Sequence, residues 1–172
     1  MYPSDVSLNL VGYSDLYFTS CKLDRNSTSG TFHLLGSSLI SWYNKKRACV
    51  ALSIVEAEYI VVGSCCAQTL LLKQQLSDFF LKLTKIHLFC YNTSVINLIK
   101  NPVQHLRTKR IKIRHHFIRG HINNGDCEIQ IFETRKQLAD LFTKPLTKDK
   151  FNYSQTELGI IDLTNVLNCW MS

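Results

Sequence analysis

A long cationic stretch without acidic residues is the first feature of the chain that could do chemistry. No Asp or Glu occurs between Asp78 and Asp126. The cationic residues there that we expect to bind nucleic acid are Arg107, Lys109, Arg110, Arg114 and Arg119. Dense positive charge attracts phosphates, and an arginine guanidinium can bind a phosphate through two hydrogen bonds. A solvated helix face is the alternative interpretation, because many charge runs have no ligand.

The chain as a whole is also basic. Its 172 residues carry a formal net charge of +7, and 45% of them are hydrophobic. This composition is typical of one globular domain and favours polyanionic partners such as nucleic acid. The chain does not open with a signal-peptide pattern, and no uninterrupted apolar run reaches the length of about 18 residues that a membrane span needs. We therefore expect an intracellular protein, cytoplasmic or nuclear.

The seven cysteines and six histidines show no metal-binding pattern. The number of cysteines is odd, and no two of them have CxxC spacing, so we expect reduced thiols. His115 and His116 lack Cys or carboxylate partners at the spacing of a zinc site. The sequence therefore does not predict structural zinc.

One carboxylate stands out by its position on a predicted helix. Residues 53–80 are expected to form a long helix, because Ser53 and Glu56 fit the Ser-x-x-Glu capping box. An apolar stripe follows on one face, formed by Val55, Tyr59, Val62, Cys66 and Leu70. Glu58 lies at the edge of this stripe, whereas Glu56 points farther away. A carboxylate at the edge of a buried face is placed to face a cleft.

The elements around this helix predict a mixed α/β fold. Alternating or continuous apolar runs predict strands over 8–13, 31–35, 39–43, 86–91 and 127–132. Asp15 then follows the end of the first strand, and Trp42 is expected in the core. Further helices are expected over 94–100, 111–122 and 137–143. Three hairpin strands, a long helix and then alternating strands and helices describe one mixed sheet.

Eight short motifs occur in order along the chain. They are VGYSD (11–15), STSG (27–30), ISW (40–42), VALS (50–53), EAEYI (56–60), NP (101–102), RTK (107–109) and QLADLFTKPL (137–146). In order and spacing they resemble the ribonuclease H-like domain of copia-type retrotransposon Pol polyproteins. The resemblance runs from about residue 9, so we expect that domain over 1–159 and a poorly determined tail over 160–172.

The resemblance implies a fold, a reaction and partners. The implied fold is a five-stranded mixed sheet, three antiparallel strands then two parallel, flanked by helices. The implied reaction is cleavage of the RNA strand of an RNA–DNA hybrid. If the chain is part of a longer polyprotein, a reverse transcriptase domain is a further expected partner.

The resemblance also implies the site residues. Two-metal hydrolysis of a phosphodiester needs several carboxylates around two cations, here two Mg²⁺ ions. Members of the family supply four acidic residues. Asp15 matches the first by its place in GYSD, Glu58 the second by its place in EAEY, and Asp140 the last by its place in QLAD. These three are the expected catalytic and metal-binding residues.

The remaining carboxylate position departs from the family. The family has Asp followed by Asn after the fourth strand, and this chain has Tyr91 followed by Asn92. A phenol with a pKa of about 10 is neutral at pH 7 and cannot replace an anionic magnesium ligand. We therefore expect weakened metal binding and weak or absent cleavage.

Three functions remain open at this point. The chain is a metal-dependent endoribonuclease with impaired activity, a non-catalytic module that binds nucleic acid, or a genomic remnant without a selected role. Cleavage of a labelled hybrid separates the first from the second.

Overall fold

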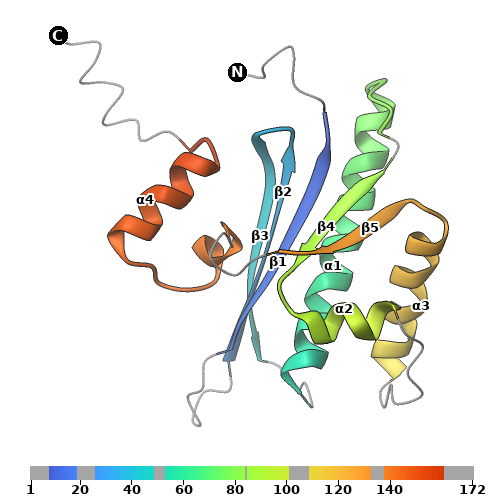
Figure 1. The fold of residues 1–172 in the computed structure, drawn as a ribbon, viewed down its shortest axis with the longest axis horizontal. Helices are drawn as coiled ribbons and strands as arrows, with labels where there is room; N and C mark the ends of the chain where they lie inside the picture. Colours follow the sequence, from blue (N-terminus) through green and yellow to red (C-terminus); the bar gives the residue numbers. More distant parts are fainter. Residues whose placement is uncertain are drawn as a thin grey trace.

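Five strands form one mixed sheet in the computed structural model, which describes residues 8–18, 26–48, 53–83, 85–100, 109–132 and 138–160. The strands are β1 (Leu10–Phe18), β2 (Asn26–Leu35), β3 (Ser38–Ala48), β4 (Ile86–Cys90) and β5 (Cys127–Ile131). Their order is β3-β2-β1-β4-β5, and β1 pairs antiparallel with β2 and parallel with β4 (Figure 1). The predicted sheet of three antiparallel and two parallel strands is confirmed.

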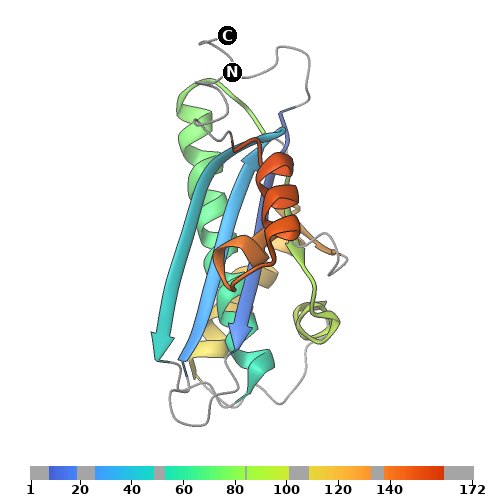
Figure 2. The same cartoon turned by 90° about the vertical axis from the view of Figure 1, so that its left-hand side faces the viewer.

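Helices lie on both faces of this sheet. They are α1 (Ile54–Asp78), α2 (Thr93–Lys100), α3 (Lys109–Asn123), the 3-10 helix η2 (Leu138–Phe142) and α4 (Lys148–Glu157). α1 lies on one face, and η2 and α4 lie on the other (Figures 1 and 2). The sequence did not predict α4, because its ten residues carry no continuous apolar stripe. In the structure Ser154 is the one buried residue of this helix.

The long helix follows its predicted cap and stripe. The Ser53 hydroxyl accepts a hydrogen bond from the Glu56 backbone N–H at 3.1 Å, as expected for an N-cap. The stripe residues Tyr59, Val62 and Cys66 are buried. Among the described helices, α1 alone is long and apolar enough to cross a membrane, but 56% of its most apolar window is buried inside the molecule, as in a core helix.

The packing of α1 on β1 is close at Gly12. A Cβ atom at Gly12 would lie 2.6 Å from the Thr69 hydroxyl oxygen and 2.9 Å from the Cys65 sulfur. Thr69 cannot easily give way, because its hydroxyl donates to the Cys65 carbonyl at 2.7 Å. Glycine therefore sets the distance between the helix and the strand.

β1 sends its side chains alternately to two cores, because successive strand residues point to opposite faces. Leu10 packs in the larger core, among residues of α1, α2, α3, β4 and β5. Val11 and Tyr13 belong to a second cluster, which includes Leu138 and Phe142 of η2. By the same alternation, Asp15 faces η2.

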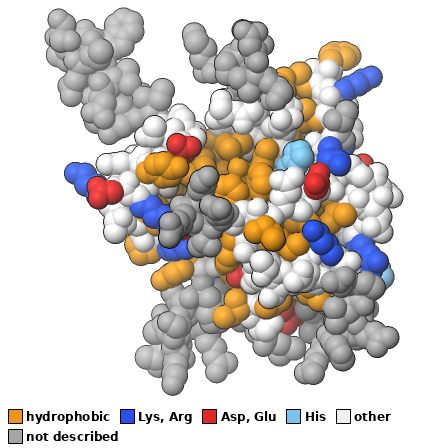
Figure 3. All heavy atoms as spheres, in the orientation of Figure 1, with side chains coloured by type: hydrophobic (Ala, Val, Ile, Leu, Met, Phe, Trp, Pro, Cys, Tyr) orange, Lys and Arg blue, Asp and Glu red, His pale blue; other side chains and the backbone are white. Residues whose placement is uncertain are grey.

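Apolar side chains fill the centre of the face drawn in Figure 3, with Lys and Arg toward its edges.

Three local expectations were wrong. β1 continues to Phe18, so Asp15 lies inside the strand, where it is held by pairing with β2 up to Ser27. β2 begins at Asn26, five residues before the strand that was expected over 31–35. The side chain of Trp42 is not in the core, since the residue is 63% exposed on β3, an edge strand of the sheet.

Candidate active site

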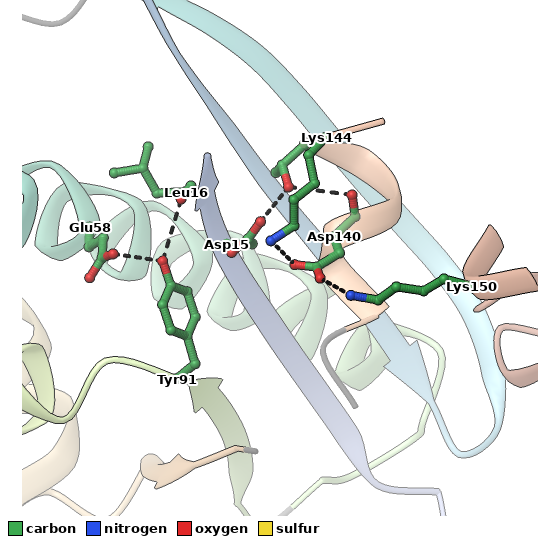
Figure 4. Close-up of polar contacts among 8 residues, drawn as sticks. Asp15, Leu16, Glu58, Tyr91, Asp140, Lys144 and Lys150 are labelled. Carbon is green, nitrogen blue, oxygen red and sulfur yellow. Dashed lines mark hydrogen bonds and ion pairs between the residues drawn. The ribbon is translucent and has the colours of Figure 1, made fainter. Parts of the chain in front are cut away.

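Asp15 occupies the centre of the candidate site. It is 3% exposed, and the Thr143 hydroxyl donates a hydrogen bond to its Oδ2 atom. Burial raises the pKa of the Asp15 carboxyl, while the Thr143 hydrogen bond and the Lys144 charge oppose part of that rise. Asp140 is close enough to contribute to the rise. Asp15 thus lies between two groups of side chains (Figure 4).

The first group joins α1 to the end of β4. The Tyr91 hydroxyl donates to Glu58 Oε1 at 2.6 Å and lies 3.4 Å from the Leu16 carbonyl oxygen (Figure 4). Asn92 Nδ2 donates to the other Glu58 oxygen, and Asn92 Oδ1 accepts from the Ser94 backbone N–H at 2.8 Å. Glu58 is 6% exposed, and both of its oxygens have protein donors. Asn92 therefore holds Glu58 and caps α2 at once.

Tyr91 is neutral in this position. Burial, followed by the hydrogen bond to Glu58 and the charges of Glu58 and Asp15, raises the pKa of the Tyr91 hydroxyl. The neutral hydroxyl donates to the Glu58 carboxylate and adds no negative charge of its own. The phenol of Tyr91 thus serves as a hydrogen-bond donor to the acidic site.

A small cavity is lined by residues that include both Asp15 and Glu58. Its volume is about 10 Å³, close to the least that holds one water. It is lined by Ser14, Asp15, Leu16, Glu58, Val61, Val62, Cys90 and Tyr91. The structure thus brings Asp15 and Glu58 to one cavity and places Asp140 outside its lining.

Asp140 forms the centre of the second group. The Lys144 ammonium lies 2.7 Å from Oδ1, and the Lys150 ammonium lies 2.6 Å from Oδ2 (Figure 4). The Lys150 contact is a directed hydrogen bond, whereas the Lys144 contact is an ion pair without hydrogen-bond direction. Both Asp140 oxygens therefore have a protein cation beside them.

The carboxylates of the site are engaged by protein donors and protein cations. Across the described ranges, no three His, Cys, Asp or Glu side chains come together closely enough to hold a metal ion. Glu58 accepts from Tyr91 and Asn92, Asp15 accepts from Thr143, and Asp140 is paired with lysines. The catalytic and metal-binding roles of Asp15, Glu58 and Asp140 stay predictions.

Comparison with known sequences decides the family. The chain is 35% identical over 155 residues to the retrovirus-related Pol polyprotein from transposon RE1 of Arabidopsis thaliana, a match over 90% of the chain. It is 32% identical over 151 residues to that from transposon TNT 1-94 of Nicotiana tabacum, over 88% of the chain. The chain is related to copia-type retrotransposon Pol polyproteins. It spans only 11% of the length of each of these relatives, and no family model matches it.

Several solved structures with a similar fold are ribonucleases H. Ribonuclease H1 from Halobacterium salinarum NRC-1 superposes with a TM-score of 0.54 at 14% identity, over 78% of this chain and 94% of that one. LC11-RNase H1, solved in complex with an RNA/DNA hybrid, superposes with a TM-score of 0.55 at 9% identity over the same shares. At these identities the likeness shows the fold, which is ribonuclease H-like as predicted.

The structure describes the side chains of two of the five predicted nucleic-acid-binding residues, Arg114 and Arg119. Arg107 lies outside the described residues, and so do the side chains of Lys109 and Arg110 in the first turn of α3. Arg119 is half-buried on α3. Arg114 donates to the Ile60 carbonyl at 2.8 Å, so one of its N–H groups joins α3 to α1. Binding of phosphate by these residues stays a prediction.

Four residues of the site were not predicted from the sequence. Thr143 and Lys144 follow Asp140 at helical spacing inside QLADLFTKPL, a signal that could have marked them. Asn92 precedes a predicted helix, which is the position of an N-cap. Lys150 had no such signal, because its partner lies ten residues away across a turn.

Proposed function

We propose that this chain is a ribonuclease H-like domain of a retroelement Pol polyprotein that binds nucleic acid and cleaves RNA–DNA hybrids weakly or not at all. The observation that carries the proposal is the 2.6 Å hydrogen bond from the Tyr91 hydroxyl to Glu58 Oε1. Tyr91 stands at the position where the family resemblance implies a metal-binding carboxylate. The ancestral reaction is two-metal hydrolysis of the RNA strand.

The charge balance of the site supports impaired cleavage. Two Mg²⁺ ions bring four positive charges, which need several anionic oxygen ligands nearby. Tyr91 removes one anion and occupies an oxygen of Glu58. The remaining carboxylates, Asp15 and Asp140, already have protein partners. Mg²⁺ binding is therefore weakened relative to a site with four free acids.

Retention of nucleic-acid binding rests on different features. The net charge of +7 and the basic helix α3 favour a polyanion. A neighbour in fold, LC11-RNase H1, was solved with an RNA/DNA hybrid. Phosphate contacts need positive charge and no metal ion, so the loss of cleavage does not entail the loss of binding. Residues 1–159 form the binding domain in this proposal, and a reverse transcriptase domain is its partner in the polyprotein.

The test is cleavage and binding of a labelled RNA–DNA hybrid in Mg²⁺. We expect the unmodified chain to bind the hybrid but to cleave it at least about 100-fold more slowly than a homologue with four carboxylates, since a lost metal ligand costs several kcal/mol of transition-state stabilisation. Tyr91→Asp should raise the rate. Tyr91→Phe, which removes the hydroxyl without adding an anion, is the control and should stay slow. Full activity of the unmodified chain would overturn the proposal.

A further inference from the structure

The environment of Asp140 is unusual for a carboxylate expected to hold a metal ion. Its side chain is 2% exposed, and ammonium groups lie within 2.7 Å of both oxygens. The two lysines are themselves 30% and 39% exposed, so each reaches inward from the surface to the buried acid. A buried charge is costly unless it is paired, and here the pairing comes from the protein.

The two lysines reach Asp140 from different segments. Lys144 lies two residues beyond the end of η2, where its backbone N–H donates to the Asp140 carbonyl oxygen at 3.1 Å and the turn brings its side chain back to the acid. Lys150 comes from α4, a helix with Ser154 as its one buried residue. The Lys150–Asp140 pair is thus among the contacts that join α4 to η2.

We propose that Lys144 and Lys150 take the place of a divalent cation at Asp140 and close this end of the site to metal ions. The inference deepens the proposed function. It depends on that function in one respect, the assignment of Asp140 as a metal ligand in the family. Two ammonium groups neutralise the carboxylate and repel a further cation. A cation must therefore displace Lys150 before it can contact Oδ2. Tyr91 is a separate obstacle at the other end of the site.

The test is the thermal midpoint of unfolding, measured in EDTA and in millimolar Mg²⁺. The midpoint of the unmodified chain should be the same in both. Lys150→Ala should lower it by about 5 °C in EDTA, because a buried acid loses one of its partners, and Mg²⁺ should restore part of the loss. Lys150→Arg keeps the charge, so its thermal midpoint should be the same in EDTA and in Mg²⁺.

Lys148→Ala is the matched control. Lys148 is an exposed lysine of the same helix, and its replacement removes the same charge without touching the Asp140 pair. This variant should unfold like the unmodified chain in both buffers. The inference is overturned if Mg²⁺ stabilises the unmodified chain as much as Lys150→Ala, if Mg²⁺ restores nothing in Lys150→Ala, or if Lys150→Ala unfolds like Lys148→Ala. No cleavage is measured, so the proposed function stands or fails separately, on the hybrid-cleavage rates.

Discussion

Tyr91→Asp should destabilise the chain by about 3 kcal/mol in EDTA, because it replaces a hydrogen-bond donor to a charged group with a second charge of the same sign. The Tyr91 hydroxyl now donates to Glu58 at 2.6 Å, in a site that also contains Asp15. The new carboxylate would face both acids with no donor between them. Chemical unfolding in EDTA measures the loss.

Mg²⁺ should reverse much of this loss, since three neighbouring carboxylates form a set of anionic oxygen ligands. Tyr91→Asn is the matched control, because it removes the same aromatic ring and adds no charge. We expect it to be less destabilised than Tyr91→Asp in EDTA and unaffected by Mg²⁺. Equal stability of the two variants in both buffers would show that the added negative charge is not the cause of the destabilisation in Tyr91→Asp.

The second large effect is a loss of stability in mild acid that depends on His33. His33 lies on β2, fully buried, with its Nε2 atom 3.9 Å from the Cys65 sulfur. Burial lowers the pKa of His33 from 6.5 to about 4. Burial also raises the pKa of the Cys65 thiol to about 12, so that thiol stays neutral throughout this range.

The direction of the effect follows from these values. The unfolded chain protonates His33 near pH 6.5, whereas the folded chain resists protonation until about pH 4. The contribution of neutral His33 to stability is complete above pH 6.5 and is lost as the pH falls toward 4, an effect of about 3 kcal/mol. Urea unfolding at several pH values between 6.5 and 4 should show this loss of unfolding free energy. In His33→Leu the total loss of unfolding free energy between pH 6.5 and pH 4 should be smaller by this amount, and parallel curves for the two chains would refute the assignment.

Local patterns were sufficient to predict most of the fold. The Ser53 cap and the stripe through Tyr59 and Cys66 mark α1, because helix ends and helix faces depend on neighbours three or four residues apart. Three hairpin strands followed by alternating strands and helices predicted one mixed sheet, and the family resemblance implied its three antiparallel and two parallel strands. Strand lengths were not predicted, since β1 runs past Asp15 only because β2 pairs with it. Exposure of Trp42 depends on β3 being an edge strand, which no local pattern reveals.

The candidate site was predictable in its positions and not in its contacts. Asp15, Glu58 and Asp140 were selected by their motifs, and Tyr91 by its departure from one. What each carboxylate touches depends on tertiary geometry. β1 directs Asp15 toward η2, and α4 delivers Lys150 to Asp140. Without the resemblance, Tyr91 would have been interpreted as a packed aromatic residue at a strand end, with no indication that its hydroxyl meets Glu58.

Calorimetric titration of the unmodified chain with Mn²⁺ tests most directly whether protein donors have replaced metal ions at these carboxylates. Mn²⁺ accepts the same oxygen ligands as Mg²⁺. We predict no saturable binding at millimolar concentrations, because Glu58, Asp15 and Asp140 each already contact Tyr91, Thr143 or the lysines. Saturable binding of two ions per chain that is abolished by Asp15→Asn would contradict this account.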